Sequence, residues 1–433
     1  MTVREIALSL LLEYENSGKY VNLSLSSHKA DSLPPKERAF LTVLLYTAVE
    51  RKLTYDYIIS ALSNRSASDI SPRARGILRL GLCQLMHIDS VPPFAAVNET
   101  VKLAGSKGER AFVNAVLREA QRRIDSLPMP ERAKNPARYL SVYYSVPLPT
   151  VKHLVRMLGE DGAESLLRTV NTVPPTTLTV NTMRITRDEF INNLASTGVT
   201  ARRTENSEIS VKIDASANPC ELFGYKEGLF FVQDEASAIA ASALGATKGD
   251  LIIDVCACPG GKSFAASVLS GGTPVFAFDL YESKLSLVKD GAARLGLEIN
   301  AAVRDARLPD ESLLEKADRV ICDVPCSGLG VLAKKPDLRY KDLDSLSELP
   351  DLQLEILTAS SRYLKSGGEM IYSTCTLGEA ENADVVNKFL SENRDFKLVP
   401  FKVGTLLAED GMLTLYPHVH GTDGFFIAKI KRL

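Results

Sequence analysis

The sequence of 433 residues predicts a multidomain protein with an all-α front part, a small α+β middle part and a C-terminal α/β part. Three observations predict this fold class. The front part carries apolar residues at helical spacing, the middle part changes to short β-rich runs, and the rest alternates strand-like runs with helical patterns. Such alternation is typical of a mostly parallel, doubly wound sheet. We therefore expect domains at residues 1–145, 146–235 and 236–433.

The front part is expected to be a set of helices. Thr2 and Glu5 have the spacing of a capping box, in which each side chain bonds the backbone amide of the other. Apolar stripes at helical spacing follow within residues 3–14, 40–48, 77–85, 96–101 and 112–120. Proline-containing helix starts lie at residues 34–35, 71–72 and 92–93. The prolines between residues 128 and 149 predict an irregular connector.

The two later parts are built from shorter elements. In the middle part we expect helices at 153–170 and 186–196 and strands at 177–181, 209–213 and 229–232. In the C-terminal part we expect strands at 251–255, 274–278, 300–303, 319–322 and 369–372, with helices at 262–270, 282–295 and 349–365. Ligands of a doubly wound sheet bind at the carboxyl ends of its strands, which is where functional residues are expected.

Composition and charge narrow the class of protein. A hydrophobic fraction of 45% and a charged fraction of 24% exclude disordered, collagen-like and coiled-coil chains. Apolar runs stay below the ~20 residues that a bilayer helix needs, and the N-terminal run lacks a signal cleavage site. We therefore expect no membrane partner. Seven cysteines, an odd number in a long chain, predict functional thiols in a reducing cytoplasm.

The net charge of -2 hides an uneven distribution. Residues 1–156 hold 22 Lys and Arg against 14 Asp and Glu, whereas the rest of the chain holds 29 against 39. A basic front part favours a nucleic-acid partner, although a solvated surface without such a partner can carry the same excess of Lys and Arg by chance.

The densest motif lies at residues 254–263, directly after a predicted strand. Gly260 and Gly261 let the backbone approach a ligand closely, and the following helix start offers free N–H groups. The motif ends like a phosphate-binding P-loop, but Cys256 stands where that loop needs a glycine, and the dinucleotide fingerprint is absent. Asp279 ends the next strand, where a carboxylate accepts ribose hydroxyls. We therefore expect a nucleoside-containing cofactor bound without a pyrophosphate.

Acids and thiols gather at the predicted strand ends. The acids are Asp254, Asp279, Asp305 and Asp323. Like charges on one rim are costly without ligands, so a functional site is expected there. Cys326 and Cys375 follow the fourth and fifth strands, where a thiol meets a substrate.

A zinc site is the competing explanation for the cysteine cluster. Cys322 and Cys326 have a suitable spacing, but only one residue separates Cys256 from Cys258, and no histidine lies near. We therefore expect no metal, and we expect Cys256 and Cys322 to be small core residues. The pair of histidines at 418 and 420 fits a metal edge or, more simply, a solvated loop.

These motifs resemble those of the RsmB-type (Sun/Fmu) ribosomal RNA cytosine-C5 methyltransferases. The front resembles the NusB-like RNA-binding domain, and the middle resembles the small RRM-like subdomain that precedes the catalytic core. The last part resembles a Rossmann-like methyltransferase domain that uses S-adenosylmethionine. The stretches that carry the resemblance are residues 93–99, 111–118, 231–237, 256–262, 323–330, 373–376 and 422–428.

The resemblance implies a role for each candidate residue. Cys375 is implied as the nucleophile that adds to the cytosine, Cys326 as the residue that assists product release, and Asp323 as a contact to the base. The implied cofactor contacts are Cys256, Ala257, Cys258, Pro259, Gly260, Gly261, Lys262, Asp279, Asp305 and Asp323. The implied substrate is a cytosine in a single-stranded or loop site of 16S ribosomal RNA, and the protein is expected to be a monomer.

The sequence departs from the family pattern in two places that concern RNA affinity. Thr179 stands where the family usually has an arginine, which removes an expected RNA contact. Residues 333–335, Ala-Lys-Lys, partly replace an arginine pair. Two alternatives stay open at this point: a transfer RNA cytosine-C5 methyltransferase, and a NusB-like RNA-binding assembly factor without activity.

Overall fold

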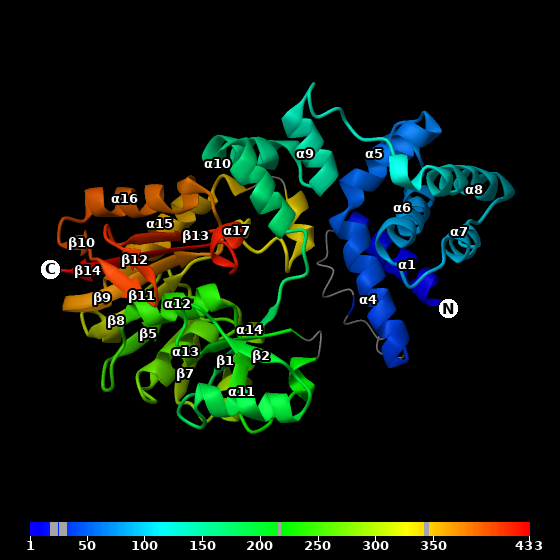
Figure 1. The fold of residues 1–433 in the computed structure, drawn as a ribbon. Coiled ribbons are helices and arrows are strands. Elements are labelled where there is room, and N and C mark those ends of the chain that lie inside the picture. Colours follow the sequence, from blue (N-terminus) through cyan, green and yellow to red (C-terminus); the bar gives the residue numbers. More distant parts are fainter. Residues whose placement is uncertain (18–24, 26–32, 215–217, 342–345) are drawn as a thin grey trace. The chain divides into compact units, whose positions relative to one another are not determined.

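The computed structural model describes residues 1–17, 25, 33–214, 218–341 and 346–433. The chain forms two compact units (Figure 1). Unit 1 combines Met1–Thr172 with Leu332–Lys341, and unit 2 combines Val173–Val331 with Asp342–Leu433. Among the described residues, no helix has both the length and the apolar character that crossing a membrane requires.

Unit 1 is all-helical, as the sequence predicts. Its helices are α1 (Val3–Ser17), α4 (Pro35–Glu50), α5 (Lys52–Ser63), α6 (Pro72–His87), α7 (Pro93–Val101), α8 (Lys107–Arg122), α9 (Pro136–Tyr144) and α10 (Leu148–Thr169), with short turns η1 (Ala67–Asp69), η2 (Ile124–Ser126) and η5 (Pro336–Tyr340). The expected capping box is present, because Glu5 N donates to Thr2 Oγ1 at 3.3 Å and Thr2 N donates to Glu5 Oε2 at 2.7 Å. Helix α6 lies in the core, and its residues from Ile77 to Gln84 are all buried.

Two expectations for the end of unit 1 are wrong. The stretch 128–149 is not irregular throughout, since residues 136–144 form α9. Asn135 caps this helix by accepting from Arg138 N at 3.0 Å, and Pro136 occupies the first helical position, where its missing N–H costs nothing. The helix expected at 153–170 begins earlier, at Leu148, and is interrupted at Gly159, whose φ of 72° suits glycine alone.

Residues 332–341 belong to unit 1 although they lie between the two segments of unit 2 in the chain. Arg339 anchors this segment, because its side chain is fully buried. Its guanidinium donates to Val170 O at 2.8 Å and to Asn171 Oδ1, and it lies 3.6 Å from a carboxylate oxygen of Glu50. The segment is therefore held by buried, charge-assisted hydrogen bonds, which are the strong kind.

Unit 2 begins with a small antiparallel sheet of the order β2-β3-β1-β4. Its elements are β1 (Thr176–Val180), α11 (Arg187–Ser196), β2 (Ala201–Arg203), β3 (Ser210–Ile213), η3 (Pro219–Glu221) and β4 (Phe230–Val232). Phe190 of α11 packs on Phe230 of β4 with ring centroids 5.3 Å apart. The predicted α+β character of the middle part is confirmed, with β2 as an additional strand, whereas the helix expected at 153–170 belongs to unit 1.

The large sheet of unit 2 has the order β10-β14-β9-β8-β5-β6-β7, and β13 pairs with β14. Its strands are β5 (Ile252–Asp254), β6 (Val275–Asp279), β7 (Ile299–Val303), β8 (Ala317–Asp323), β9 (Leu364–Thr374), β10 (Phe396–Leu398), β13 (Met412–Leu415) and β14 (Phe425–Arg432). The helices and turns around it are α12 (Glu235–Leu244), α13 (Gly261–Leu269), α14 (Glu282–Leu295), η4 (Glu311–Leu313), α15 (Leu349–Ser361), η7 (Glu379–Glu381), α16 (Ala383–Glu392) and α17 (Pro417–His420). A separate ribbon pairs β11 (Phe401–Val403) with β12 (Leu406–Ala408). Strands β5 to β9 pair in parallel, whereas β14 pairs antiparallel with β9, and β10 and β13 each pair antiparallel with β14.

Helices cover both faces of this sheet (Figure 1). Ile252 packs with residues of α12 on one face, and the next residue, Ile253, packs with residues of α15 and α16 on the other. Because successive strand residues point to opposite faces, both must be apolar, which explains the continuous apolar runs of these strands. The strand order reverses between β5 and β8, and such a switch point opens a crevice at the carboxyl ends.

Candidate functional site

The predicted acids lie at the carboxyl edge of the large sheet. Asp254, Asp279 and Asp323 are the last residues of β5, β6 and β8, and these strands are neighbours in the sheet. Asp305 lies two residues beyond the end of β7. Asp254 and Asp323 therefore flank the switch point.

Asp254 is a buried residue that positions the loop after β5. Its carboxylate accepts from Ser263 Oγ at 2.6 Å and from Cys256 N at 3.3 Å, and only 1% of the residue is exposed. Burial raises the pKa of Asp254 to about 7. Its bonds tie the start of the loop to helix α13.

The loop of residues 256–261 is shaped by Gly260 and by the carboxylate of Asp279. Gly260 has a φ of 109°, and a Cβ atom there would lie 2.4 Å from the ring of Phe264, so only glycine fits. Asp279 accepts from Cys258 N at 3.2 Å and from Tyr281 N at 3.1 Å. A carboxylate has about four lone-pair sites, so acceptor capacity remains for a ligand.

The other side chains of this loop are neutral. Burial raises the pKa of the Cys256 thiol well above its ordinary value, and burial together with Asp279 raises that of Cys258 to about 12. Ala257 is buried and Pro259 is exposed. The loop therefore offers backbone groups and uncharged sulfur to a ligand.

Asp305 is engaged by Arg307. The guanidinium lies 2.6 Å from the carboxylate, and Arg307 N also donates to it at 3.0 Å. These hydrogen bonds lower the pKa of Asp305, which is therefore ionised at neutral pH.

Asp323 forms a polar cluster with Lys262 and Ser373. Its two carboxylate oxygens accept from Lys262 Nζ at 2.6 Å and from Ser373 Oγ at 2.7 Å. Burial lowers the pKa of Lys262, but the Asp323 carboxylate outweighs burial and the net shift is upward. Lys262 also interacts electrostatically with Cys375 and lies 5.0 Å from the ring centroid of Phe425. The ammonium ion of Lys262 thus pairs with the Asp323 carboxylate and also interacts electrostatically with Cys375.

The structure brings Cys326 and Cys375 together, with their sulfur atoms 3.0 Å apart. Cys375 directly follows β9, and Cys326 lies in the loop after β8. The hydrogen bond with Cys375, followed by burial, raises the pKa of Cys326 well above its ordinary value. Cys326 is therefore a thiol at neutral pH, and either sulfur can be the donor of the hydrogen bond between them.

Sequence reasoning missed the residues that hold the Cys326 loop. Glu381 Oε2 accepts from Ser327 N and from Gln353 Nε2, both at 2.9 Å, and Gln353 Nε2 also donates to Pro325 O at 2.9 Å. Glu381 and Gln353 belong to η7 and α15, and neither lies in a recognisable motif.

A backbone bridge closes the loop on the other side. Gly330 N donates to Cys375 O at 2.9 Å, and Gly424 N donates to Gly330 O at 2.8 Å. A Cβ atom on Gly330 would lie 1.9 Å from Gly424 O, so this approach requires glycine. The bridge fixes the separation between the two cysteine-bearing segments.

The other residues singled out in the sequence differ in burial and in setting. Cys322 is buried in β8, as expected, whereas Cys256 is only partly buried. The histidines at 418 and 420 belong to the short helix α17, so the expected loop is wrong. Thr179 is buried and donates to Gln233 Oε1 at 3.0 Å, which places it away from any surface contact with RNA. In the part of the chain that the structure describes, no group of three or more His, Cys, Asp or Glu side chains is placed to hold a metal ion.

Three family models match successive parts of the chain. The NusB family matches residues 1–122, an RsmF/B-like ferredoxin-like domain matches residues 147–219, and the 16S rRNA methyltransferase RsmB/F model matches residues 241–431.

Whole-chain relatives agree with these matches. The chain is 36% identical over 447 residues to a probable ribosomal RNA small subunit methyltransferase B of Bacillus subtilis, with 100% of this chain and 99% of the relative covered. It is 33% identical to the Synechocystis protein of the same description, with 100% of both chains covered. The structure of a methyltransferase homologue from Pyrococcus horikoshii has a TM-score of 0.61 at 26% identity, covering 69% of this chain and 99% of its own.

Proposed function

Because the chain belongs to the family of ribosomal RNA small subunit methyltransferases B, we propose that it methylates carbon 5 of a cytosine in 16S ribosomal RNA. Family membership makes the protein an rRNA methyltransferase. The observation that supports carbon 5 of cytosine as the target is the pair of thiols, Cys326 and Cys375, 3.0 Å apart at the carboxyl edge of the sheet.

A thiol is needed because carbon 5 of cytosine is a poor nucleophile. When the Cys375 thiolate bonds to carbon 6, the electron pair of the 5,6 double bond moves to carbon 5, which then attacks an electrophilic methyl group. After transfer, water takes the proton from carbon 5, the electron pair left behind re-forms the 5,6 double bond, and the carbon–sulfur bond breaks with its electron pair on sulfur. Cys375 is thus released as a thiolate.

The neighbouring groups suit the two sulfur atoms to different roles. The ammonium of Lys262 favours an ionised sulfur at Cys375, because a nearby positive charge stabilises a thiolate. Cys326 keeps its proton at neutral pH and assists the departure of Cys375. Asp323, fixed by Lys262 and Ser373, contacts the polar edge of the base. The target base must leave its stack to reach these groups, which favours a single-stranded or loop site.

The loop of residues 256–261 fits a nucleoside-containing methyl donor. Helix α13 begins at Gly261 with no described side chain as its cap, so its first N–H groups are available to a ligand. Asp279 has acceptor capacity for ribose hydroxyls, and Asp305, beyond the end of β7, is assigned to the adenine end. S-adenosylmethionine, when bound, supplies the electrophilic methyl group. The residues assigned to hold it are Cys256, Ala257, Cys258, Pro259, Gly260, Gly261, Lys262, Asp279, Asp305 and Asp323.

The direct test is transfer of a labelled methyl group from S-adenosylmethionine to unmodified 16S ribosomal RNA, with transfer RNA as a parallel substrate. We expect 5-methylcytosine in the 16S RNA only. Incorporation into transfer RNA alone would favour the first alternative, and no incorporation would favour the RNA-binding assembly factor. A monomeric state and a cytoplasmic location remain predictions.

Replacing Lys262 with methionine is expected to lower kcat by about 100- to 1,000-fold, as for loss of one preorganised charge in an active site. The rising limb of the pH–rate profile should also move to higher pH, because Cys375 loses the positive charge that favours its thiolate. Rates measured from pH 6 to 10 check both effects. Lys289→Met, an exposed change on α14, is the control. An unchanged pH profile with only a weaker affinity for the methyl donor would contradict this role.

Gly330→Ala is expected to reduce methyl transfer by about 100-fold, since displacements near 1 Å at a reacting group have effects of that size. The new Cβ atom cannot share the space of Gly424 O, so the Cys326 loop must move. Single-turnover rates measure the effect. Gly108→Ala in α8, where the added atom meets nothing within 4 Å, is the matched control and should behave like the wild type.

A further inference from the structure

Unit 1 contains a cavity of about 580 Å³ that the proposed chemistry does not use. Its volume lies in the range of about 300–1,000 Å³ that is common for small-ligand sites. Helices α5, α9 and α10 and the residues after α10 contribute to its walls. The lining residues that matter here are Arg51, Tyr139, Tyr143, Tyr144, Arg168 and Asn171.

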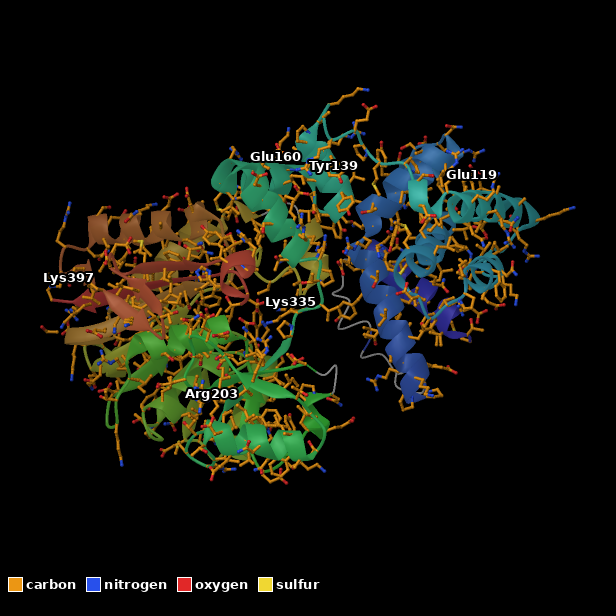
Figure 2. All side chains as sticks on the ribbon, in the orientation of Figure 1. Glu119, Tyr139, Glu160, Arg203, Lys335 and Lys397 are labelled. Carbon is orange, nitrogen blue, oxygen red and sulfur yellow. The ribbon has the colours of Figure 1, made fainter. Side chains whose placement is uncertain are left out.

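Tyrosines form one side of the cavity. The rings of Tyr139 and Tyr143 are stacked, with centroids 5.3 Å apart and an interplanar angle of 21°. The ring of Tyr144 packs edge-on against the ring of Tyr143, with centroids 4.9 Å apart, and Tyr144 is itself buried. Tyr143 remains 45% exposed, so a rigid, supported ring borders the cavity and also reaches solvent. Figure 2 labels Tyr139 on α9 and Glu160 on the neighbouring α10.

The charges around the cavity argue against a site for a free anion. Glu164 lies 2.6 Å from Arg132 and accepts from the Tyr144 hydroxyl at 3.2 Å, and Arg51 lies 3.3 Å from Glu50. Arg168 is 4.0 Å from Glu164 and its side chain is 73% exposed, which leaves it able to reach a phosphate at the rim. The interior therefore favours a flat, neutral ligand, with a cation at its edge.

We propose that this cavity binds an unstacked base of single-stranded RNA, which lies against Tyr143 while Arg168 contacts the adjoining phosphate. Stacking on aromatic side chains with backbone contacts from cations is how proteins hold single strands without reading their sequence. The excess of 22 basic over 14 acidic residues in residues 1–156 brings RNA to this unit. This proposal depends on the proposed function in one respect, namely that the substrate is RNA.

The absence of tryptophan from the chain allows a specific reporter. Tyr143→Trp keeps an aromatic ring at the cavity and adds the sole indole. Titration with a single-stranded RNA 12-mer, without methyl donor, should quench its fluorescence, whereas a blunt duplex of the same sequence should quench it far less. Phe223→Trp is the control, because Phe223 is 42% exposed and lies in unit 2. Quenching by inorganic phosphate alone would indicate an anion site and contradict the proposal.

Affinity measurements provide an independent check. Tyr143→Ala should weaken binding of the labelled 12-mer by about 5- to 100-fold, the effect of losing one stacked base, whereas Tyr143→Phe should retain wild-type affinity. Phe223→Ala should change nothing. Wild-type affinity in Tyr143→Ala would overturn the proposal while the methyl-transfer assay still stands. Conversely, if the wild-type protein transferred no methyl group, the proposed function would be overturned. The quenching of Tyr143→Trp fluorescence by single-stranded RNA would still support the binding site.

Discussion

Cys375→Ala is expected to lower methyl transfer by at least about 10⁴-fold, because it removes the sulfur that is proposed to bond to carbon 6 and so activate carbon 5. The fold should persist, since the change removes one sulfur atom at a partly exposed position. Affinity for S-adenosylmethionine, measured by calorimetry, should stay within about twofold, because the proposed contacts to it lie on other residues. Loss of turnover with intact binding of S-adenosylmethionine would show that Cys375 acts in the reaction and is not needed for the fold.

The control for this variant is Cys220→Ala, which removes an exposed thiol in the turn η3, outside the motifs of the site. It should retain the wild-type rate. Methyl transfer at the wild-type rate by Cys375→Ala would contradict the assignment of the nucleophile.

Cys326→Ala is expected to trap a covalent complex between protein and RNA. Cys326 carries its proton 3.0 Å from the Cys375 sulfur, so its loss leaves addition possible but slows the release of the methylated base. The adduct should accumulate to nearly one RNA per protein and migrate as a slow band on a denaturing gel. Multiple turnover should fall below one product per enzyme over minutes.

The double variant Cys326→Ala with Cys375→Ala is the matched control for trapping, and it should give no slow band. An adduct that forms with Cys375→Ala instead would mean that the two thiols have exchanged roles.

The sequence allowed much of the fold to be predicted where its patterns are periodic. Apolar stripes with caps identified the main helices of unit 1, and alternation of strands and helices identified the parallel core of the sheet.

Helix α12 was not predicted because residues 235–244 are small and apolar almost all round, which leaves no periodic stripe. Helix α9 escaped because Pro136 was interpreted as a breaker, although proline is favoured at the first position of a helix.

The position of the site could be predicted from the sequence, but the three-dimensional arrangement of its side chains could not. Strand-end positions placed Asp323, Cys326 and Cys375 on one rim, since parallel strands end at the same edge. The close approach of the two sulfur atoms depends on Glu381 and on the contact of Gly330 with the backbone, and these tertiary contacts have no local signature. The return of residues 332–341 to unit 1 likewise depends on a buried arginine whose partners lie far away in the chain.

The central claim is that the sulfur of Cys375 bonds to the cytosine, and RNA carrying 5-fluorocytosine tests it most directly. Fluorine cannot leave as the carbon-5 proton does, so the adduct persists once the methyl group has been transferred. Digestion of the trapped complex and mass spectrometry should find the modified nucleotide on the peptide that contains Cys375. A nucleotide attached to Cys326, or no adduct while methyl transfer proceeds on normal RNA, would contradict the account.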